Sequence, residues 1–100
     1  MNCYFHPDAE EEFLGAIDWY EEHQENLGLD FAREVYAAIG RAMECPEAWP
    51  VLEGDVRRCQ TGRFPYGVLY SQEPGGIVIL AVMHLHRDPG YWKRRKDTHD

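Results

Sequence analysis

Two histidines near the end of an apolar run are the side chains whose spacing points most directly to chemistry. His84 and His86 are two residues apart, so in an extended strand both imidazoles lie on one face and could reach one metal ion. A metal site needs at least a third ligand, and the sequence has neither an HExxH motif nor a Cys/His cluster to supply it. The sequence therefore predicts no metal site and no cofactor.

Either histidine could instead act as a general acid or base, with Arg87 and Tyr91 a few residues away. The sequence places no GxSxG serine and no orienting carboxylate beside them. Cys59 follows two arginines, so it is the one thiol with cationic neighbours and a candidate nucleophile. A buried and inert thiol is the more frequent role of a free cysteine.

A larger set of cationic and aromatic residues lies between positions 57 and 95. Such a mixture has the composition of a surface that binds phosphate and stacks on nucleic-acid bases. Equally, the aromatic residues could form the core while the arginines pair with acidic helices, and composition leaves both alternatives open. The set comprises Arg57, Arg58, Arg63, Arg87, Lys93, Arg94 and Arg95, together with Phe64, Tyr66, Tyr70, Tyr91 and Trp92.

Charge is divided unevenly between the two halves of the chain. Residues 1–56 carry 14 acids and 2 bases, residues 57–100 carry 4 acids and 8 bases, and −12 plus +4 gives the net charge of −8. An acidic chain is a poor sequence-independent binder of nucleic acid, although a local basic face could dock one. We therefore expect a protein with two differently charged sides.

Length and composition predict a single domain over residues 1–100 with one hydrophobic core. The sequence contains no apolar run of about 18 residues that could span a membrane, and its N-terminus lacks the features of a signal peptide. Three cysteines without a CxxC pair indicate neither a disulfide framework nor a zinc site. We expect a soluble cytoplasmic protein with no membrane partner.

The periodicity of apolar residues predicts the elements in the first half. Residues 3–6 form a short strand, and amphipathic helices follow over 8–24 and 29–44, the second capped by Asp30 or its neighbour. The two helices make an αα-hairpin whose acidic residues lie on a solvated outer face. The Pro-rich segment 46–54 is a connector.

The second half is predicted to form the sheet. Strands are expected over 56–61, 64–72 and 77–86, the last apolar on both faces as a central strand should be. Residues 91–96 are expected to be one or two helical turns or a loosely packed tail, and 97–100 to be frayed. The fold class is α+β: an N-terminal strand and an α-helical hairpin packed on an antiparallel three- to four-stranded sheet, with a short basic C-terminal tail or helix.

Taken together, these segments resemble the RelE/ParE superfamily of toxins from bacterial type II toxin–antitoxin systems. The resemblance covers nearly the whole chain, from Phe5 to Arg95, and its second half is the more specific. The order of strand, helical hairpin and three-stranded meander is one part of it. The matching residues are Arg57-Arg58, the block Arg63-Phe64-Pro65-Tyr66 with Tyr70, the strand 77–82, and the ending His84, Arg87, Pro89, Tyr91 and Trp92.

The resemblance implies a small cytoplasmic toxin that a cognate antitoxin neutralises in a hetero-oligomer. RelE-like members of the superfamily cleave messenger RNA on the ribosome, using basic residues and a C-terminal tyrosine. ParE-like members share the fold, lack most of those residues and poison DNA gyrase. A further alternative is an inactive member that only binds its antitoxin.

The residues that distinguish the two branches favour the ParE-like one. RelE-like toxins have an arginine directly after the aromatic residue of the third strand, where this chain has Gly67 after Tyr66. They have another at the end of the fourth strand, where this chain has Leu85, whereas Tyr91 matches the C-terminal tyrosine. Losing one cation beside a scissile phosphate typically costs about 10²-fold or more in rate. We therefore expect an inhibitor of DNA gyrase that acts by protein binding, with the ribosome and messenger RNA as the alternative partners.

The resemblance also implies roles for particular residues. An antitoxin that folds on binding would lay a helix or strand into an apolar groove. The residues expected to contact the antitoxin are Trp19, Tyr20, Arg63 and Tyr70. Those expected to contact the target are Arg87, Tyr91, Trp92, Lys93, Arg94 and Arg95. Under the ribonuclease alternative, catalysis would be shared by Arg57, Arg58, Arg63, His84, His86, Arg87 and Tyr91.

Overall fold

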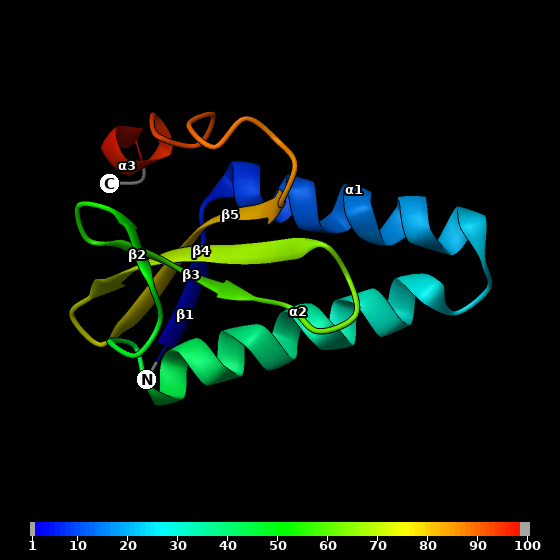
Figure 1. Ribbon diagram of the computed structural model, residues 1–100, viewed down its shortest axis with the longest axis horizontal. Coiled ribbons are helices and arrows are strands. Elements are labelled where there is room, and N and C mark those ends of the chain that lie inside the picture. Colours follow the sequence, from blue (N-terminus) through cyan, green and yellow to red (C-terminus); the bar gives the residue numbers. More distant parts are fainter. Residues whose placement is uncertain (1, 99–100) are drawn as a thin grey trace.

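A helical hairpin and a five-stranded sheet make up the protein (Figure 1). The structure is a computed structural model, and it describes residues 2–98. Its elements, in chain order, are β1 (Asn2–Phe5), α1 (Pro7–His23), α2 (Leu27–Glu44), β2 (Val51–Glu53), β3 (Val56–Gln60), β4 (Tyr66–Glu73), β5 (Gly76–His84) and α3 (Arg95–Thr98). The predicted α+β class is confirmed.

Helix α1 begins where the sequence places its start signals. Pro7 occupies the first turn, and the His6 Nδ1 atom accepts a hydrogen bond from the Asp8 amide at 3.0 Å. Asp8 and Glu10 add negative charge at the positive end of the helix dipole. These local features explain why the predicted start, residue 8, lies one residue from the observed one.

Helix α2 is capped differently from the prediction. It begins at Leu27, so Asp30 lies inside its first turn, and the N-cap residue Asn26 is left-handed (φ 69°) without a side-chain cap. The cap comes from α1, because the Glu21 carboxylate accepts from the amides of Asn26 and Gly28 at 2.9 and 3.0 Å. The Glu21 carboxylate, near the end of α1, thus provides the cap that the sequence predicts for Asp30 or its neighbour.

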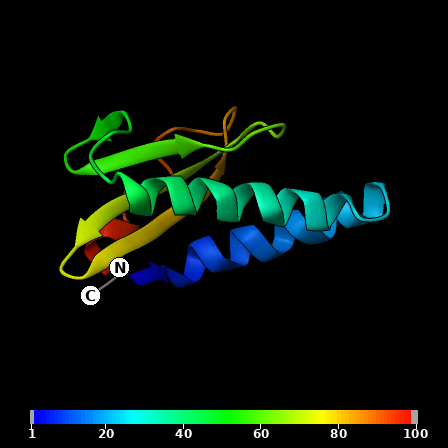
Figure 2. The ribbon, with the colours of Figure 1, turned by 90° about the horizontal axis from the view of Figure 1, so that it is seen from below.

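The two helices approach closely at Gly28. A Cβ atom there would lie 2.5 Å from the Ile17 carbonyl oxygen, so only glycine fits. Both helices then cover one face of the sheet, where Phe13 and Phe31 are buried and Phe64 closes the aromatic cluster. The hairpin extends past one end of the strands (Figures 1 and 2).

The sheet has the order β1-β5-β4-β3-β2, and β1 runs parallel to β5 while all other neighbours are antiparallel. The prediction of three to four antiparallel strands is therefore corrected to a five-stranded mixed sheet. The extra strand, β2, lies within the segment 46–54, for which the Pro-rich sequence predicts only a connector, and its three residues are all exposed. Strand β5 is buried on both faces up to Met83, as predicted for a central strand.

The second face of the sheet is covered by the C-terminal segment, residues 85–98, rather than by a helix layer (Figure 1). Trp92 is 2% exposed and packs in a cluster with Leu69, Leu80 and Met83. Of the two predicted alternatives, a short helix is confirmed by α3, and a loosely packed tail is wrong because a large indole anchors the segment. The predicted fraying of 97–100 falls partly on residues 99–100, which lie outside the described part.

Within residues 2–98, neither helix of the hairpin nor α3 is long and apolar enough to cross a membrane.

The stability of the fold should depend on the indole of Trp92. Replacing a buried Trp by Ala typically costs about 3–5 kcal/mol, because the cavity is only partly refilled. We expect Trp92→Ala to lower the free energy of unfolding by that amount in urea titrations. Trp19→Ala is the matched control, since Trp19 is 55% exposed, and it should change stability by less than about 1 kcal/mol. Equal effects of the two substitutions would show that the C-terminal segment is not part of the folded core.

Candidate functional site

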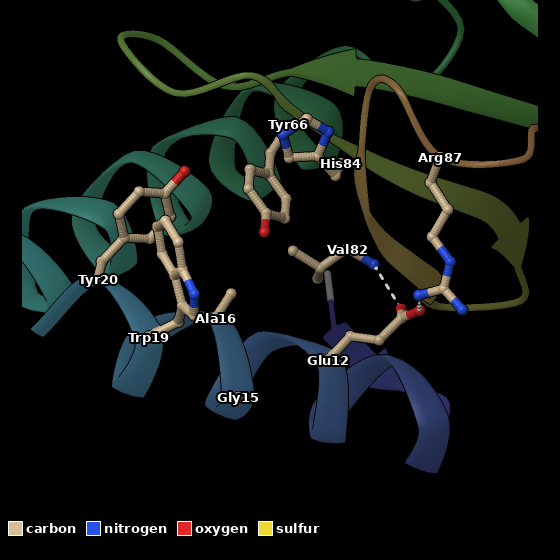
Figure 3. A pocket seen from close by; sticks show the side chains of 9 residues that line it. All are labelled: Glu12, Gly15, Ala16, Trp19, Tyr20, Tyr66, Val82, His84 and Arg87. Carbon is tan, nitrogen blue, oxygen red and sulfur yellow. Dashed lines mark hydrogen bonds and ion pairs between the residues drawn. The ribbon is translucent and has the colours of Figure 1, made fainter. Parts of the chain in front are cut away.

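The Glu12 carboxylate joins three parts of the chain at one edge of the sheet. It accepts two hydrogen bonds from the Arg95 guanidinium, at 2.8 and 3.0 Å, and one from the Val82 amide at 3.1 Å (Figure 3 shows the last). The Glu12 and Arg95 side chains are 15% and 12% exposed. Burial opposes the charge of Arg95, but the bonds to Glu12 outweigh it and raise the pKa of Arg95. Helix α1, strand β5 and the C-terminal segment are thereby fixed together.

Tyr91 and Arg87 lie against this ion pair. The Arg87 guanidinium carbon is 3.8 Å from the centre of the Tyr91 ring, and Arg87 Nη1 is 3.6 Å from Glu12 Oε2. The Tyr91 hydroxyl is buried and lies near the Glu12 carboxylate. Burial, and then the neighbouring Glu12 carboxylate, raise the pKa of Tyr91. Tyr91 is therefore held as a neutral phenol that faces the protein interior.

The two candidate histidines lie together, although not on one strand as predicted. Strand β5 ends at His84, and the chain turns so that the His86 amide donates to His84 Nδ1 at 3.1 Å. Their rings are 5.3 Å apart, and the Tyr66 ring is 5.2 Å from that of His84. Among the described residues, no group of three or more His, Cys, Asp and Glu side chains is placed to hold a metal ion.

A groove of about 410 Å³ opens beside these residues, between α1 and the ends of β4 and β5 (Figure 3). Its volume lies in the range of ligand-binding pockets. Aromatic side chains form one end of the groove and Arg87 lies at the other (Figure 3). The residues that line it are Glu12, Gly15, Ala16, Trp19, Tyr20, Tyr66, Val82, His84 and Arg87. The groove thus brings together two of the predicted antitoxin contacts, Trp19 and Tyr20, and two of the catalytic candidates.

The three arginines of the β3 region lie elsewhere. Arg57 Nη1 donates to the carbonyl oxygens of Glu47 and Trp49 at 3.0 and 2.7 Å, so it holds the connector. Arg58 lies across Gly67, where a Cβ atom would be 2.8 Å from Arg58 Cδ. Arg63 is in the loop before β4 and is 3.4 Å from Asp30 of α2. These arginines do not converge on the groove or on one another.

Tyr70 and Cys59 are core residues. The Tyr70 side chain is buried and its hydroxyl donates to the Pro46 carbonyl at 2.7 Å. Burial raises the pKa of Tyr70 to about 12. Burial also raises the pKa of the Cys59 thiol, which disfavours the reactive thiolate. Tyr70 therefore presents no surface to a partner in this structure, and Cys59 is not positioned as a nucleophile.

The cations of the C-terminal segment are paired with acids. Lys93 Nζ is 2.9 Å from Glu53 Oε1, and Lys96 Nζ is 2.8 Å from Asp55 Oδ1. The hydrogen bond from Lys96 lowers the pKa of Asp55. Arg95 is used by Glu12, and Trp92 is buried. The segment is consequently much less basic toward a partner than its sequence indicates.

Glu12 is the residue that sequence reasoning missed, because it was counted among the acids of a solvated helix face. A signal was present: Glu12 lies four residues before Ala16 and eight before Tyr20, on the stripe that faces the sheet. An acid on an apolar stripe is buried only when a cation or an amide pairs with it. That rule predicts a partner for Glu12 but not which one.

Comparison with known protein families gives a match to most of the chain. Residues 4–89 match the family described as the ParE toxin of the type II toxin–antitoxin system, parDE. The match covers most of the chain, from the second half of β1 to the turn after β5. A search of the curated proteins finds no match.

Neutralising Glu12 should destabilise the protein. Glu12→Gln keeps the size of the side chain but leaves the Arg95 charge without its carboxylate, and breaking a buried pair typically costs about 3–5 kcal/mol. We expect a loss of that order in the free energy of unfolding. Glu53→Gln, which breaks the exposed pair with Lys93, is the control and should cost less than about 1 kcal/mol. If Glu12→Gln costs as little as the control, the bonds of residue 12 to the Val82 amide and to Arg95 do not depend on the negative charge of Glu12.

Tyr91 should make stability sensitive to alkaline pH. Its pKa is raised in the folded state, so the unfolded chain loses the phenol proton first; stability is intact below about pH 10 and falls as pH rises further. In Tyr91→Phe, the free energy of unfolding should fall with pH less steeply than in the unchanged protein, by about 1 kcal/mol per pH unit. Urea titrations between pH 9 and pH 11 measure this slope. Tyr4→Phe, at an exposed position, controls for loss of a phenol. An unchanged pH dependence in Tyr91→Phe would contradict the burial of its hydroxyl.

Proposed function

Because the chain belongs to the ParE toxin family of type II toxin–antitoxin systems, we propose that it inhibits DNA gyrase by protein binding rather than by cleaving RNA. Membership of the family implies an antitoxin partner. We also propose that residues 1–100 form a single toxin domain, which a cognate antitoxin holds inactive in the cytoplasm.

The position of the Tyr91 hydroxyl carries the argument against ribonuclease activity. A ribosome-dependent ribonuclease of this superfamily would need that hydroxyl to reach the RNA, as the resemblance of the sequence implies. In this structure the Tyr91 hydroxyl oxygen is buried beside Glu12. The guanidinium groups of Arg87 and Arg95 both pack against the Tyr91 ring. For this hydroxyl to reach a substrate atom, the C-terminal segment would have to move away from Glu12.

The distribution of cations supports the same conclusion. Stabilising a charged phosphoryl transition state requires cations gathered at one place. Instead Arg63 is paired with Asp30, and Arg87 lies beside Glu12. Arg57 is bonded to carbonyl oxygens of the connector. Among the described residues, Arg57, Arg63 and Arg87 therefore do not come together to form one phosphate-binding site.

A gyrase contact is best placed on the exposed part of the C-terminal segment. Arg87, Lys93 and Arg94 are exposed there, whereas Trp92 and most of Arg95 are not. The sequence-based set of target contacts is accordingly reduced to its exposed cations. Such rim charges influence the rate of association and the choice of partner more than the total affinity.

The proposal is tested with the purified chain in two assays, supercoiling by DNA gyrase and message cleavage on purified ribosomes. We expect inhibition of supercoiling and no cleavage. Lys93→Glu should weaken the inhibition about tenfold, because it replaces an exposed cation of the proposed contact by an acid. Arg33→Glu is the matched control, because it makes the same charge change at an exposed ion pair on α2.

Three results would contradict the proposal. Cleavage that is lost in the triple variant His84→Ala, His86→Ala, Tyr91→Phe would establish the ribonuclease alternative. Equal effects of Lys93→Glu and Arg33→Glu would show that the gyrase contact does not lie on the C-terminal segment. Inactivity in both assays, together with no growth arrest on expression, would leave an antitoxin-binding protein only.

A further inference from the structure

Strand β1 forms one margin of the sheet, and no strand lies on its outer side among residues 2–98 (Figure 2). The amides of Asn2 and His6 donate to carbonyl oxygens along β5 and the turn before it, so Asn2, Tyr4 and His6 direct their backbone groups toward β5. Cys3 and Phe5, which lie between them, direct their amide and carbonyl groups outward. The margin of the sheet thus presents a short row of backbone donors and acceptors.

The two edges of the sheet differ in how they are protected. The opposite edge, β2, follows Pro50, pairs irregularly with β3 between Val51 and Glu53, and holds Glu53 in an ion pair with Lys93. Proline, irregular pairing and charge are features that keep an edge from pairing with another strand. By contrast, β1 contains no proline and no charged residue, and its register with β5 is regular. Only its length of four residues limits the pairing of β1.

Exposed apolar side chains flank β1 on both faces of the sheet. Tyr4 is 54% exposed and lies on the face away from the helices, because its two neighbours in β1 pack against the helix-covered core. A hollow of about 390 Å³ lies beside it. On the helical face, Phe5 lines a second hollow of about 210 Å³ with the exposed side chains of Leu14 and Tyr36. Phe5 also lines the first hollow, so the apolar surface continues around the margin.

A second copy of β1, related to the first by a two-fold axis at Tyr4, matches this row of backbone groups. In such an antiparallel pair, Cys3 of each copy lies opposite Phe5 of the other, and each of these two pairs exchanges two hydrogen bonds. Every outward amide and carbonyl of β1 then has a partner. Tyr4 lies opposite Tyr4 of the other copy in the closer, non-hydrogen-bonded position, where a pair of aromatic side chains stabilises the contact.

The two-fold arrangement also closes on itself. It covers β1 in both copies and leaves only the protected β2 edges, so the joined sheet does not grow further. No charged side chain within β1 opposes the pairing at close range. Each chain has a net charge of −8, so the repulsion between two copies comes from the surrounding surface and is weakened by salt.

We propose that the protein forms a homodimer through the outer edges of β1, in which two five-stranded sheets join into one. Tyr4 contacts its own copy on one face, and the hollow with Leu14 and Tyr36 lies at the rim of the contact on the other. Because only four residues of each copy pair, we expect a weak dimer with a dissociation constant on the order of 10 μM. The inference requires neither gyrase nor an antitoxin.

Sedimentation equilibrium of the purified chain, at concentrations around that value, measures the dimer. Cys3→Pro is the test variant, because it removes an outward amide and leaves the amides that face β5, and proline is tolerated on edge strands. Cys3→Ala keeps the amide and is the matched control. We expect Cys3→Pro to weaken dimerisation about 30-fold, since the dimer loses two hydrogen bonds, and Cys3→Ala to change it less than about threefold. Melting temperatures show that each variant is folded.

A cysteine at position 4 tests the register without depending on the proline variant. Opposite Cα atoms in a non-hydrogen-bonded pair are about 4.5 Å apart, which a disulfide spans. Tyr4→Cys, in a background of Cys3→Ala and Cys45→Ala, should therefore form a covalent dimer on mild oxidation. Leu52→Cys in the same background is the control, because Leu52 is exposed on the other edge strand, and it should stay monomeric.

The native Cys3 gives a second test of the register. In the proposed pair, the Cys3 residues of the two copies are diagonal neighbours, about 7–8 Å apart, which is beyond the reach of a disulfide. The variant Cys45→Ala, which retains Cys3, should consequently form no covalent dimer under the oxidation that links Tyr4→Cys. Cross-linking through Cys3 instead of position 4 would contradict the two-fold axis at Tyr4.

Salt provides an independent measurement. We expect dimerisation to strengthen as salt is added, because the β1 contact is uncharged and only the net charge of the two chains opposes it. A dimer that salt dissociates would rest on ionic contacts and would overturn the proposal. The proposal would equally be overturned by a chain that stays monomeric at every concentration, by equal dimerisation of Cys3→Pro and Cys3→Ala, or by equal cross-linking of Tyr4→Cys and Leu52→Cys.

Discussion

The bond between Glu12 and Arg95 is the constraint on which the rest of this structure depends. It connects residues 83 positions apart, and its carboxylate also binds the Val82 amide on the outer edge of β5. Without it, the C-terminal segment would keep only the longer contacts of Arg87 with Glu12 and of Arg95 with Asp8 as ionic links to α1, and the Tyr91 ring would lose its Arg95 contact. Because the pair is largely buried, either charge alone would be unfavourable there. Together with the buried Trp92 indole, this contact holds the C-terminal segment in the place where the Tyr91 hydroxyl is buried.

Local sequence signals account for the elements that are long and periodic. The two helices and the strands β3, β4 and β5 were expected close to their observed bounds, since caps, prolines and apolar periodicity act within a few residues. The sequence does not predict strand β2, because a strand of three residues inside a Pro-rich segment carries no periodic signal. The parallel pairing of β1 with β5 joins the ends of the chain, and no local pattern encodes it.

The candidate site was only partly predictable for the same reason. The spacing of His84 and His86 predicts that their side chains lie close together, and they do, although β5 ends at His84 and not beyond His86. Trp19 and Tyr20 were recognised as large aromatic residues on a helix, and they do line the groove. By contrast, composition could not show that Trp92 is buried or that Lys93 and Lys96 are paired with the acids of the β2–β3 turn. Those contacts depend on where the C-terminal segment folds back.

The central place of β5 in the sheet has a consequence for synthesis on the ribosome. β1 emerges first, but its partner emerges near the end, and the sheet cannot close until residues 76–84 are available. The helical hairpin can form early from local contacts, whereas pairing between distant segments is slow. A nascent chain therefore presents an apolar hairpin without its sheet, which is a state prone to aggregation. The C-terminal segment and the groove therefore take their places together and late, once the residues up to Arg95 can fold onto α1 and β5.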